Sequence, residues 1–490
     1  MPSGQLERAL GFGSLGLTLM LDRGRQAVRA RTGGGGGGGG DGGDGGSGAA
    51  GAGGSSGGGS SSSSSSPISP ISPISDTGAE ALAATLCRMR GAALKLGQML
   101  SIQDEDLLPA PLVKALRDVR TGANVMPAAQ LHGQLDAELG EGWRERLGVA
   151  SFTEVPLAAA SIGQVHRASV RADDADGADD AGDAAAPLEE VVLKVQYPGV
   201  ATGIESDLTN LSWLISSTGL APKGLFIENI ISVARRELAE ECDYVTEAAH
   251  QARYAALLRD AGMEGDFIVP RVYPRLSSRA VLATEFVDGV QFESLLGMDQ
   301  QTRNRAARRL LRLTVKELFE WNFMQTDPNW GNYLYDPATD RIVLLDFGAC
   351  QAYPRAFTEQ YFGIVAAAAN ENTPQLLDMS EQLGFLTGEE NEEMRTAHIR
   401  AGLLVGEPFQ AGGDFNFAQS NLTARLGEHA KAFMKNRLTP PPTEIYSLHR
   451  KLAGAFLACI KLRAVIPCRD LLEEAAEHMP PSAWQVAKPP

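Results

Sequence analysis

Two short motifs in the middle of the 490-residue chain place two acids and an amide at a spacing that suits phosphate chemistry. In the first motif Asp327 and Asn332 lie five residues apart, and the second, Asp346-Phe347-Gly348, begins fourteen residues after Asn332. Phosphoryl transfer from MgATP needs one carboxylate near the attacking oxygen, and an amide with a second carboxylate that hold Mg²⁺ over the phosphates. Asp-Phe-Gly alone is a weak signal, but the two motifs in this order and at this spacing strongly predict such chemistry.

The segment between the two motifs predicts a β-hairpin that would hold these side chains together. Tyr333 to Tyr335 and the apolar run Ile342 to Leu345 flank a turn-rich stretch, Asp336 to Asp340. Apolar and aromatic runs on either side of Pro, Asp and Thr residues are typical of two strands joined by a turn. Asp327 and Asn332 would therefore lie just before the first strand of the hairpin, and Asp346 would lie just after the second.

Upstream, Phe152 to Val170 and Val191 to Val195 predict a strand, a small-residue loop, a second strand, and then a strand that bears Lys194. This pattern resembles the nucleotide-covering sheet of a protein kinase, in which a Gly-rich loop wraps the phosphates and a strand lysine neutralises them. Here Ala158 to Ala160 stand where Gly is usual. Because each methyl group keeps the backbone away from phosphate, we expect a different nucleotide geometry.

Two further elements complete the predicted site. A single helix is predicted from Ile230 to Leu258, and one of its acids should pair with Lys194. The apolar run from Ala280 ends in a polar, Gly-containing break that corresponds to a kinase hinge, where backbone groups of Glu285 and Val287 would hold adenine. The acids of the helix are Glu237, Glu240, Glu241, Asp243 and Glu247, and the other predicted helices span Arg303 to Trp321, Phe357 to Asn370, Asn391 to Val405 and Tyr446 to Ala464.

The bulk composition excludes several classes of protein. A net charge of −16 argues against nucleic acid as a partner, because no broad basic surface is available to neutralise phosphates. The five cysteines are scattered without metal-ligand spacing, which indicates a reducing compartment rather than a disulfide framework. The early apolar run Leu10 to Leu21 is shorter than the about 20 residues that span a bilayer. The basic bias around it is compatible with a targeting or membrane-surface segment.

The folded part of the chain is expected to begin near Asp76. Gly33 to Ser66 is nearly pure Gly and Ser, and the Pro-Ile-Ser units that follow cannot bury a core either. From Asp76 onward, apolar residues at spacings of three and four predict an amphipathic helix with Lys95 and Gln98 on one face. Arg171 to Glu190 is an acidic insertion that we expect to form a disordered hairpin tip.

Together these motifs resemble the UbiB/ADCK (AarF-domain-containing) atypical kinases, and most closely the mitochondrial members that support coenzyme Q biosynthesis. The resemblance is carried by Lys-Leu-Gly-Gln from Lys95, the Ala loop, Glu241-Cys242-Asp243, and the two motifs described first. It implies an α+β, bilobal protein-kinase-like fold with a family-specific helical extension. The expected units are a basic segment and linker (1–75), the extension (76–150), the small lobe (151–288, with the insertion at 171–190) and the large lobe (289–490).

The resemblance also implies a role for each site residue. Lys194 would contact the ATP phosphates and pair with Glu247, beside the catalytic Asp327. Asn332 and Asp346 would hold Mg²⁺. The nucleotide-binding set would consist of Ala158, Ala159, Ala160, Ser161, Gly163, Lys194, Glu285 and Val287.

A further group of residues would control access to the site. Glu241 and Asp243 would form the family's Glu-x-Asp motif and meet Lys95, with Gln98, on a helix that lies where a protein kinase admits peptide. Three features argue against peptide phosphorylation independently of the resemblance: the loop lacks its glycines, Gln-Thr precedes Asp327 where His-Arg is usual, and no Ala-Pro-Glu segment follows. The acceptor would then be water, or something small or lipid-like.

The resemblance implies an ATP- and Mg²⁺-dependent kinase or ATPase that acts on or beside lipid intermediates of ubiquinone synthesis. Its expected partners are those lipids, a membrane surface, other coenzyme Q biosynthesis proteins and a second copy of the chain. Its expected location is the matrix face of the inner mitochondrial membrane, with a plastid as the alternative. Two other functions stay open on the residues alone: a small-molecule kinase of the aminoglycoside or choline type, and a nucleotide-binding scaffold without turnover.

Overall fold

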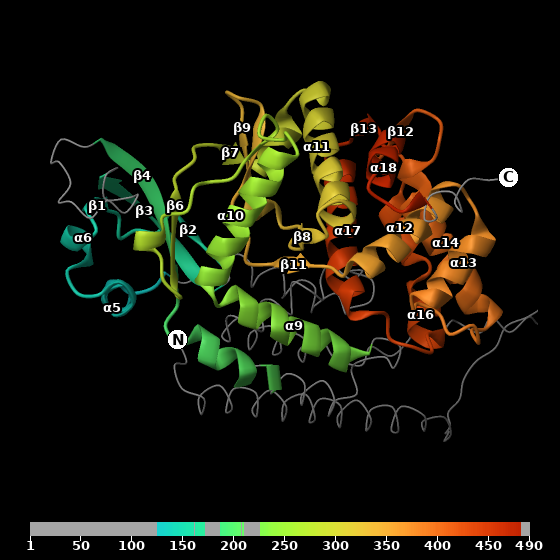
Figure 1. Cartoon of the computed structure of the whole chain (residues 1–490), viewed down its shortest axis with the longest axis horizontal. Helices are drawn as coiled ribbons and strands as arrows, with labels where there is room; N and C mark the ends of the chain where they lie inside the picture. The colour runs from blue at the N-terminus through green and yellow to red at the C-terminus, as the bar shows by residue number, and fades with distance from the viewer. Residues whose placement is uncertain (1–124, 161, 172–186, 207, 210–225, 482–490) are drawn as a thin grey trace, which may run out of the picture.

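The computed structural model describes residues 125–160, 162–171, 187–206, 208–209 and 226–481. A sheet-based small lobe lies at the left of Figure 1, and a larger lobe, built mostly of helices, lies at the right. The predicted helix with Lys95 and Gln98, and Ser161 of the Ala loop, lie outside the described residues. Arg171 and Leu188 to Glu190 belong to paired strands, so the acidic insertion is shorter than the expected 171–190.

The small lobe is an antiparallel five-stranded sheet with helices α5 (Ala128–Leu139) and α6 (Trp143–Arg146) beside it. Its strand order is β1 (Val149–Phe152), β3 (Gly163–Arg171), β4 (Leu188–Gln196) and β6 (Val281–Glu285), with β2 (Ala158–Ala159) paired to β3. Val191, Leu193 and Val195 of β4 are buried in one cluster with Leu131 of α5. Because side chains alternate along a strand, Lys194 lies on the opposite face of the sheet.

The predicted helix from Ile230 to Leu258 is wrong as a single element. The structure has two helices, α9 (Ile227–Glu241) and α10 (Tyr244–Asp260), which are separated at Cys242 and Asp243. Asp243 adopts an extended backbone, and its Oδ1 accepts hydrogen bonds from the N–H groups of Val245 (3.0 Å) and Thr246 (3.3 Å). A side chain that caps a helix in this way starts a new helix instead of continuing the previous one.

The large lobe contains three small sheets and most of the helices. The main sheet has the order β5 (Phe267–Ile268), β10 (Arg341–Leu344), β9 (Tyr333–Asp336) and β7 (Val290–Gln291), and the two-stranded pairs are β8 (Phe323–Gln325) with β11 (Cys350–Ala352) and β12 (Asp414–Asn416) with β13 (Val465–Pro467). The helices are α11 (Gln300–Phe319), α12 (Arg355–Ala369), α13 (Thr373–Gln382), α14 (Glu392–Gly406), α15 (Leu422–Gly427), α16 (Ala430–Asn436), α17 (Thr443–Lys461) and α18 (Arg469–Ala476). Short 3-10 turns cover Pro274–Leu276, Phe292–Gly297, Trp330–Asn332 and Glu407–Phe409.

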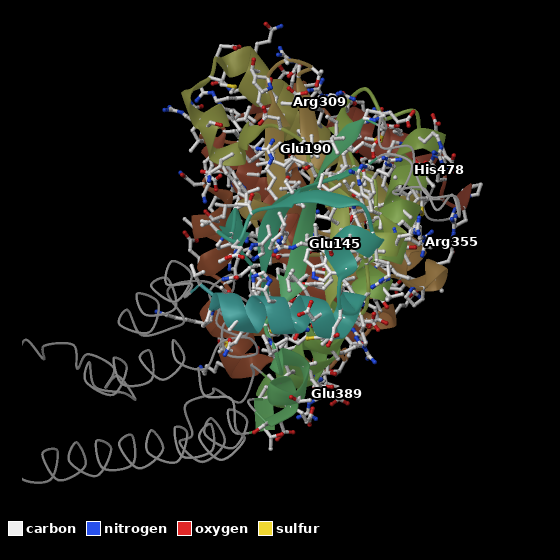
Figure 2. All side chains as sticks on the ribbon, turned by 90° about the vertical axis from the view of Figure 1, so that its left-hand side faces the viewer. Glu145, Glu190, Arg309, Arg355, Glu389 and His478 are labelled. Atoms are coloured by element: carbon white, nitrogen blue, oxygen red, sulfur yellow. The ribbon has the colours of Figure 1, made fainter. Side chains whose placement is uncertain are left out.

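The predicted hairpin between the two motifs is present as antiparallel β9 and β10. Its turn is fastened to helix α11 by arginines. Arg305 donates from Nε to Asp340 Oδ2 at 2.8 Å, and Arg309 donates from Nη1 to the carbonyl oxygen of Asp340 (Arg309 is labelled in Figure 2). The strands that connect the two motifs are therefore held against α11.

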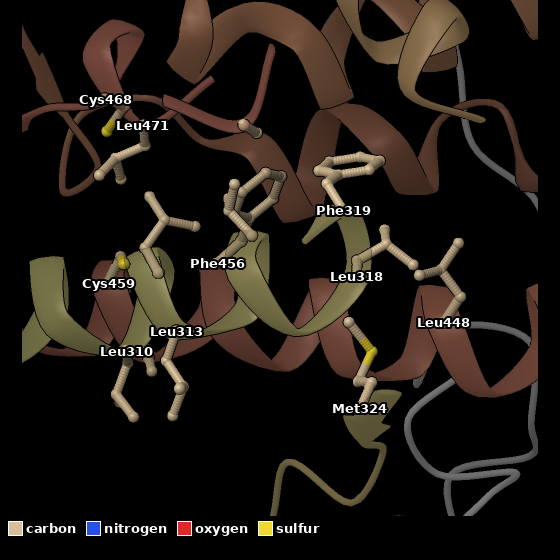
Figure 3. Packing of buried hydrophobic residues seen from close by; sticks show 14 of the residues in the cluster. Leu310, Leu313, Leu318, Phe319, Met324, Leu448, Phe456, Cys459, Cys468 and Leu471 are labelled. Carbon is tan, nitrogen blue, oxygen red and sulfur yellow. The ribbon is translucent and has the colours of Figure 1, made fainter. Parts of the chain in front are cut away.

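The largest hydrophobic core lies in the large lobe, where α11 and α17 pack against each other. Figure 3 shows Leu313 and Phe319 of α11 near Phe456 and Cys459 of α17, all of them buried. Contacts of this kind bury both helices along one face and fix their relative positions. None of the helices in the described part of the chain is both long enough and apolar enough to cross a bilayer.

Candidate active site

Lys194 joins both lobes through two carboxylates. Its Nζ donates to Glu247 of α10 at 2.8 Å (Oε1) and 3.1 Å (Oε2), and to Asp346 Oδ2 at 2.8 Å. The side chain of Lys194 is 15% exposed and that of Glu247 only 1%, whereas Asp346 is 32% exposed. Strand β4, helix α10 and the segment after β10 thus meet at one ammonium group. Of the three side chains in this cluster, that of Asp346 is the most exposed to solvent.

The electrostatics of this cluster follow from its burial. Burial raises the pKa of the Glu247 carboxyl to about 7, although the neighbouring Lys194 opposes this shift. Burial would by itself lower the pKa of Lys194, but the charges of Asp346 and Glu247 outweigh it and hold that pKa well above its usual value. One cation is therefore shared by two carboxylates, and it stays charged at physiological pH.

Asp327 and Asn332 come together at the entrance to the hairpin. The 3-10 turn Trp330–Asn332 brings Asn332 Nδ2 within 3.1 Å of Asp327 Oδ2, to which it donates. The carbonyl oxygen of Asn332 accepts from the N–H of Leu345 at 2.9 Å. Since Leu345 immediately precedes Asp346, this bond joins the first motif directly to the second.

The Asp346-Phe347-Gly348 turn is seated against helix α10. The N–H of Gly348 donates to Asp346 Oδ1 at 3.0 Å, and the buried ring of Phe347 lies 5.1 Å from that of Tyr254. A Cβ added at Gly348 would lie 3.3 Å from Glu247 Oε2 and 3.6 Å from Glu241 Cγ. Glycine at this position therefore lets the turn approach two buried acids closely.

The predicted Glu-x-Asp motif occupies the junction of α9 and α10. Glu241 is buried at the end of α9 beside Gly348, and Asp243 caps α10. Arg279 Nε lies 3.7 Å from Asp243 Oδ2. Their expected partners Lys95 and Gln98 fall outside the described ranges, so the structure brings only the acidic half of this group into the site.

The Ala loop borders the sheet above Lys194. Ala158 and Ala159 are exposed on β2, and the N–H of Ala160 donates to the carbonyl oxygen of Gly163 at 2.8 Å. Gly163 itself is buried, and a Cβ there would lie only 2.4 Å from the carbonyl oxygen of Val195. Glycine is thus required at this position for the close approach of β3 to β4.

The predicted hinge directly follows β6. The N–H of Glu285 donates to the carbonyl oxygen of Arg271 at 2.8 Å, and the N–H of Phe286 donates to that of Glu190 at 2.9 Å. Within the described ranges, no hydrogen bond is made by the N–H of Val287. The carbonyl of Glu285 and the N–H of Val287 remain the groups that could hold a planar base here.

Sequence reasoning missed a buried ion pair behind the loop that carries Asp327. Arg450 of α17 donates from Nη2 to Glu237 of α9 at 2.9 Å, and from Nε to the carbonyl oxygen of Thr326 at 3.2 Å. Both charged side chains are buried. Arg450 therefore contacts the residue directly before Asp327. The two partners lie 213 residues apart in the chain, and no local pattern in the sequence indicates their contact.

Comparisons with known proteins identify relatives over most of the chain. The sequence profile of the ABC1 atypical kinase-like domain matches residues 118–380. "Atypical kinase COQ8B, mitochondrial" of Danio rerio is 44% identical over 398 residues, which cover 81% of this chain and 60% of that protein. The Rattus norvegicus protein of the same name is 44% identical, with 81% and 72% covered, and "Atypical kinase COQ8, mitochondrial" of Saccharomyces cerevisiae is 38% identical, with 81% and 76% covered.

A solved structure supports the fold alone. The complex of Rv3197 with erythromycin from Mycobacterium tuberculosis superposes with a TM-score of 0.55 at 24% sequence identity, and the match covers 84% of this chain and 97% of that one. The expected α+β kinase-like fold and the expected resemblance to UbiB/ADCK proteins are both confirmed. The chain belongs to the ABC1 atypical kinase-like family.

Proposed function

We propose that this atypical kinase binds MgATP and uses it to support coenzyme Q biosynthesis in the mitochondrion, on or beside lipid intermediates of that synthesis. The observation that supports ATP use most directly is the meeting of Lys194, Glu247 and Asp346 next to the Asp327–Asn332 pair. The mitochondrial location and the connection to coenzyme Q rest on the names of the COQ8 relatives. The matrix face of the inner membrane is the corresponding site of action.

In this mechanism Lys194 binds the ATP phosphates, while Glu247 holds its ammonium group in place from the buried side. Asn332 and Asp346 would hold Mg²⁺, because an amide oxygen and a carboxylate next to the phosphates are ligands that this ion prefers. When bound, the ion neutralises charge on the phosphates. Asp327 accepts a hydrogen bond from the attacking water or hydroxyl and orients it. The carbonyl of Glu285 and the N–H of Val287 bind adenine, under the Ala loop.

A lipid-like or small acceptor fits the surroundings of Asp327 better than a peptide does. Helix α12 begins at Arg355, seven residues after Gly348, and this leaves little room for a peptide platform. Thr326 stands where a protein kinase usually has an arginine, and the Arg450 that reaches its backbone is already paired with Glu237. Lipids of a membrane surface, other coenzyme Q biosynthesis proteins and a second copy of the chain are the partners that we assign to this enzyme.

The test is ATP binding and hydrolysis by the full chain, with and without Mg²⁺ and anionic liposomes, beside Asp346→Asn. The matched control is Asp378→Asn, which changes an exposed acid of α13 in the same way. We expect Mg²⁺-dependent hydrolysis that the first variant loses and the second retains. The same variants should respectively fail and succeed in restoring ubiquinone to yeast cells that lack their COQ8 protein.

Two results would replace this function with another. Binding without turnover under every condition would make the chain a nucleotide-binding scaffold. Turnover with an aminoglycoside or choline, together with failure of the wild-type chain to restore ubiquinone, would make it a small-molecule kinase.

A further inference from the structure

A large cavity lies in the helical lobe, apart from the residues that surround Lys194. It has a volume of about 430 Å³ and lies between α9, α12, α14, α16 and α17. Cavities of about 300–1,000 Å³ with mostly apolar walls are typical of small-molecule sites. Its walls are formed largely by aliphatic and aromatic side chains, among them Val365, Leu376, Phe385, Phe433, Leu452 and Phe456.

One wall of the cavity carries a cation with no described counter-ion. Arg437, which follows α16, lies with its guanidinium carbon 5.2 Å from the centroid of the Phe433 ring. Its Nε is buried without a hydrogen-bond partner, and so is the hydroxyl of the neighbouring Tyr446. No carboxylate in the described part of the chain pairs with Arg437, and burial lowers the pKa of its guanidinium below the usual value. Leaving a partly buried charge such as Arg437 without a counter-ion is costly.

The other polar groups of the cavity do not neutralise this charge. His398 Nε2 lies 2.9 Å from Ser380 Oγ, and the ring of His449 stacks on Phe385 at 5.9 Å. Burial, reinforced by the charge of Arg437, lowers the pKa of the half-buried His398 imidazole to about 4, so this ring is neutral at physiological pH. The pKa of His449, whose side chain is exposed to the cavity, is lowered in the same direction. Arg450 also lines the cavity, but Glu237 already balances its charge. Arg437 is therefore the cation that a ligand would meet here.

We propose that this cavity binds an amphipathic anion, a carboxylate on a long apolar chain, with its head at Arg437 and Tyr446. The carboxylate would accept hydrogen bonds from the guanidinium and from the hydroxyl, and so supply the partners that both groups lack. The chain would lie among the aliphatic and aromatic walls, where burial of apolar surface favours binding. The cavity makes no use of Lys194, Asp327 or Asp346, so this binding does not depend on ATP turnover.

The test measures binding of three probes that share one alkyl chain, dodecanoate, dodecanol and dodecylammonium, to the full-length protein by titration calorimetry. We expect dodecanoate to bind most tightly and dodecylammonium least. Arg437→Met should weaken dodecanoate about tenfold, the effect of losing one charge-assisted hydrogen bond, and leave dodecanol nearly unchanged. Ala401→Phe, which places a ring on the cavity wall formed by α14, should weaken both probes.

The control is Arg395→Met, the same change at an α14 residue that does not line the cavity, and it should alter no affinity. ATP binding by every variant reports whether the lobe is still folded. Equal affinity for the anionic and cationic probes, or an unchanged dodecanoate affinity in Arg437→Met, would overturn the assignment. Absence of binding by the wild-type protein would also overturn it, because the cavity would then be filled by something else.

Discussion

Gly454 of α17 lies so close to Pro328, in the loop that carries Asp327, that a Cβ added to this glycine would fall 2.0 Å from the Cβ of the proline. Pro328 directly follows Asp327 in the chain, so α17 limits how far this loop can move toward the helix. Since non-bonded carbon atoms cannot approach within that distance, any larger residue at 454 must push the loop or the helix aside.

We therefore expect Gly454→Ala to lower kcat for ATP hydrolysis and to destabilise the protein by about 1–3 kcal/mol, the usual cost of overpacking. The change is measured by steady-state kinetics and urea unfolding. The control is Gly133→Ala in the interior of α5, where an added Cβ meets nothing within 4 Å. That variant should be neutral or stabilised by up to about 1 kcal/mol, because alanine favours a helix. Equal kcat and equal unfolding free energy in the two variants would show that the loop at Pro328 moves aside without cost.

The raised pKa of Glu247 gives a dependence of stability on pH with a definite sign. In the folded protein the pKa of the Glu247 carboxyl is about 7, above that of a glutamate in the unfolded chain. The contribution of Glu247 to the free energy of unfolding is therefore fully present at low pH. Stability should fall as pH rises from about 5 to about 7.5, by on the order of 3 kcal/mol.

Glu247→Gln should remove this part of the pH dependence, whereas Glu389→Gln, at an exposed acid, should leave it in place (Glu389 is labelled in Figure 2). The measurement is urea unfolding across this pH range. If the free energy of unfolding changed with pH in the same way in the wild-type protein and in Glu247→Gln, then Glu247 would be ionised in the folded protein over this whole pH range.

The buried pair of Arg450 and Glu237 should be costly to break from one side. Arg450→Met leaves the carboxylate of Glu237 buried and uncompensated, and we expect a loss of about 3–5 kcal/mol in unfolding free energy. Adding Glu237→Leu should recover much of that loss, because no charge then remains. Activity should stay low in the double variant, since the carbonyl of Thr326 still lacks its donor.

The control for this pair is Arg355→Met, which removes an exposed ion pair with Glu359 and should cost less than about 1 kcal/mol. Full recovery of kcat in the double variant would show that Arg450 acts only through stability.

Gly163 should tolerate no side chain. A Cβ at this position meets the carbonyl oxygen and carbon of Val195 at 2.4 Å and 3.0 Å, and backbone of a paired strand cannot move away alone. Gly163→Ala is expected to lower the unfolding free energy by about 1–3 kcal/mol and to weaken ATP binding, because β3 and β4 carry the loop and Lys194. Gly265→Ala, where an added Cβ has free space, is the comparison in the same chemical denaturation. An unaffected Gly163→Ala would contradict the strand spacing described above.

The sequence predicted the features that depend on neighbours in the chain. The hairpin between Asn332 and Asp346 follows from two apolar runs and a turn, and the helix predicted from Arg303 to Trp321 is observed at Gln300–Phe319. The break at Asp243 was missed because apolar periodicity continues across it, whereas the capping bonds of a single side chain decide where the helix ends.

Contacts between distant parts of the chain could not be predicted in the same way. The pairing of Lys194 with Glu247 came from the family resemblance and not from the spacing of the acids, of which five were candidates. Arg450 with Glu237, Gly454 with Pro328, and the cavity beside Arg437 depend on how helices from different segments pack. No local periodicity records such packing.

The contacts between α17 and the loop around Asp327 also affect the order in which parts of the protein can fold during synthesis. Arg450 and Gly454 contact a loop that leaves the ribosome well over a hundred residues before them. At about 5–20 residues per second, that interval lasts on the order of ten seconds, during which the loop around Asp327 lacks its contacts with α17. A nascent chain that stops short of Thr443 would therefore carry every predicted catalytic residue but lack the contacts that Arg450 and Gly454 of α17 make with the loop around Asp327.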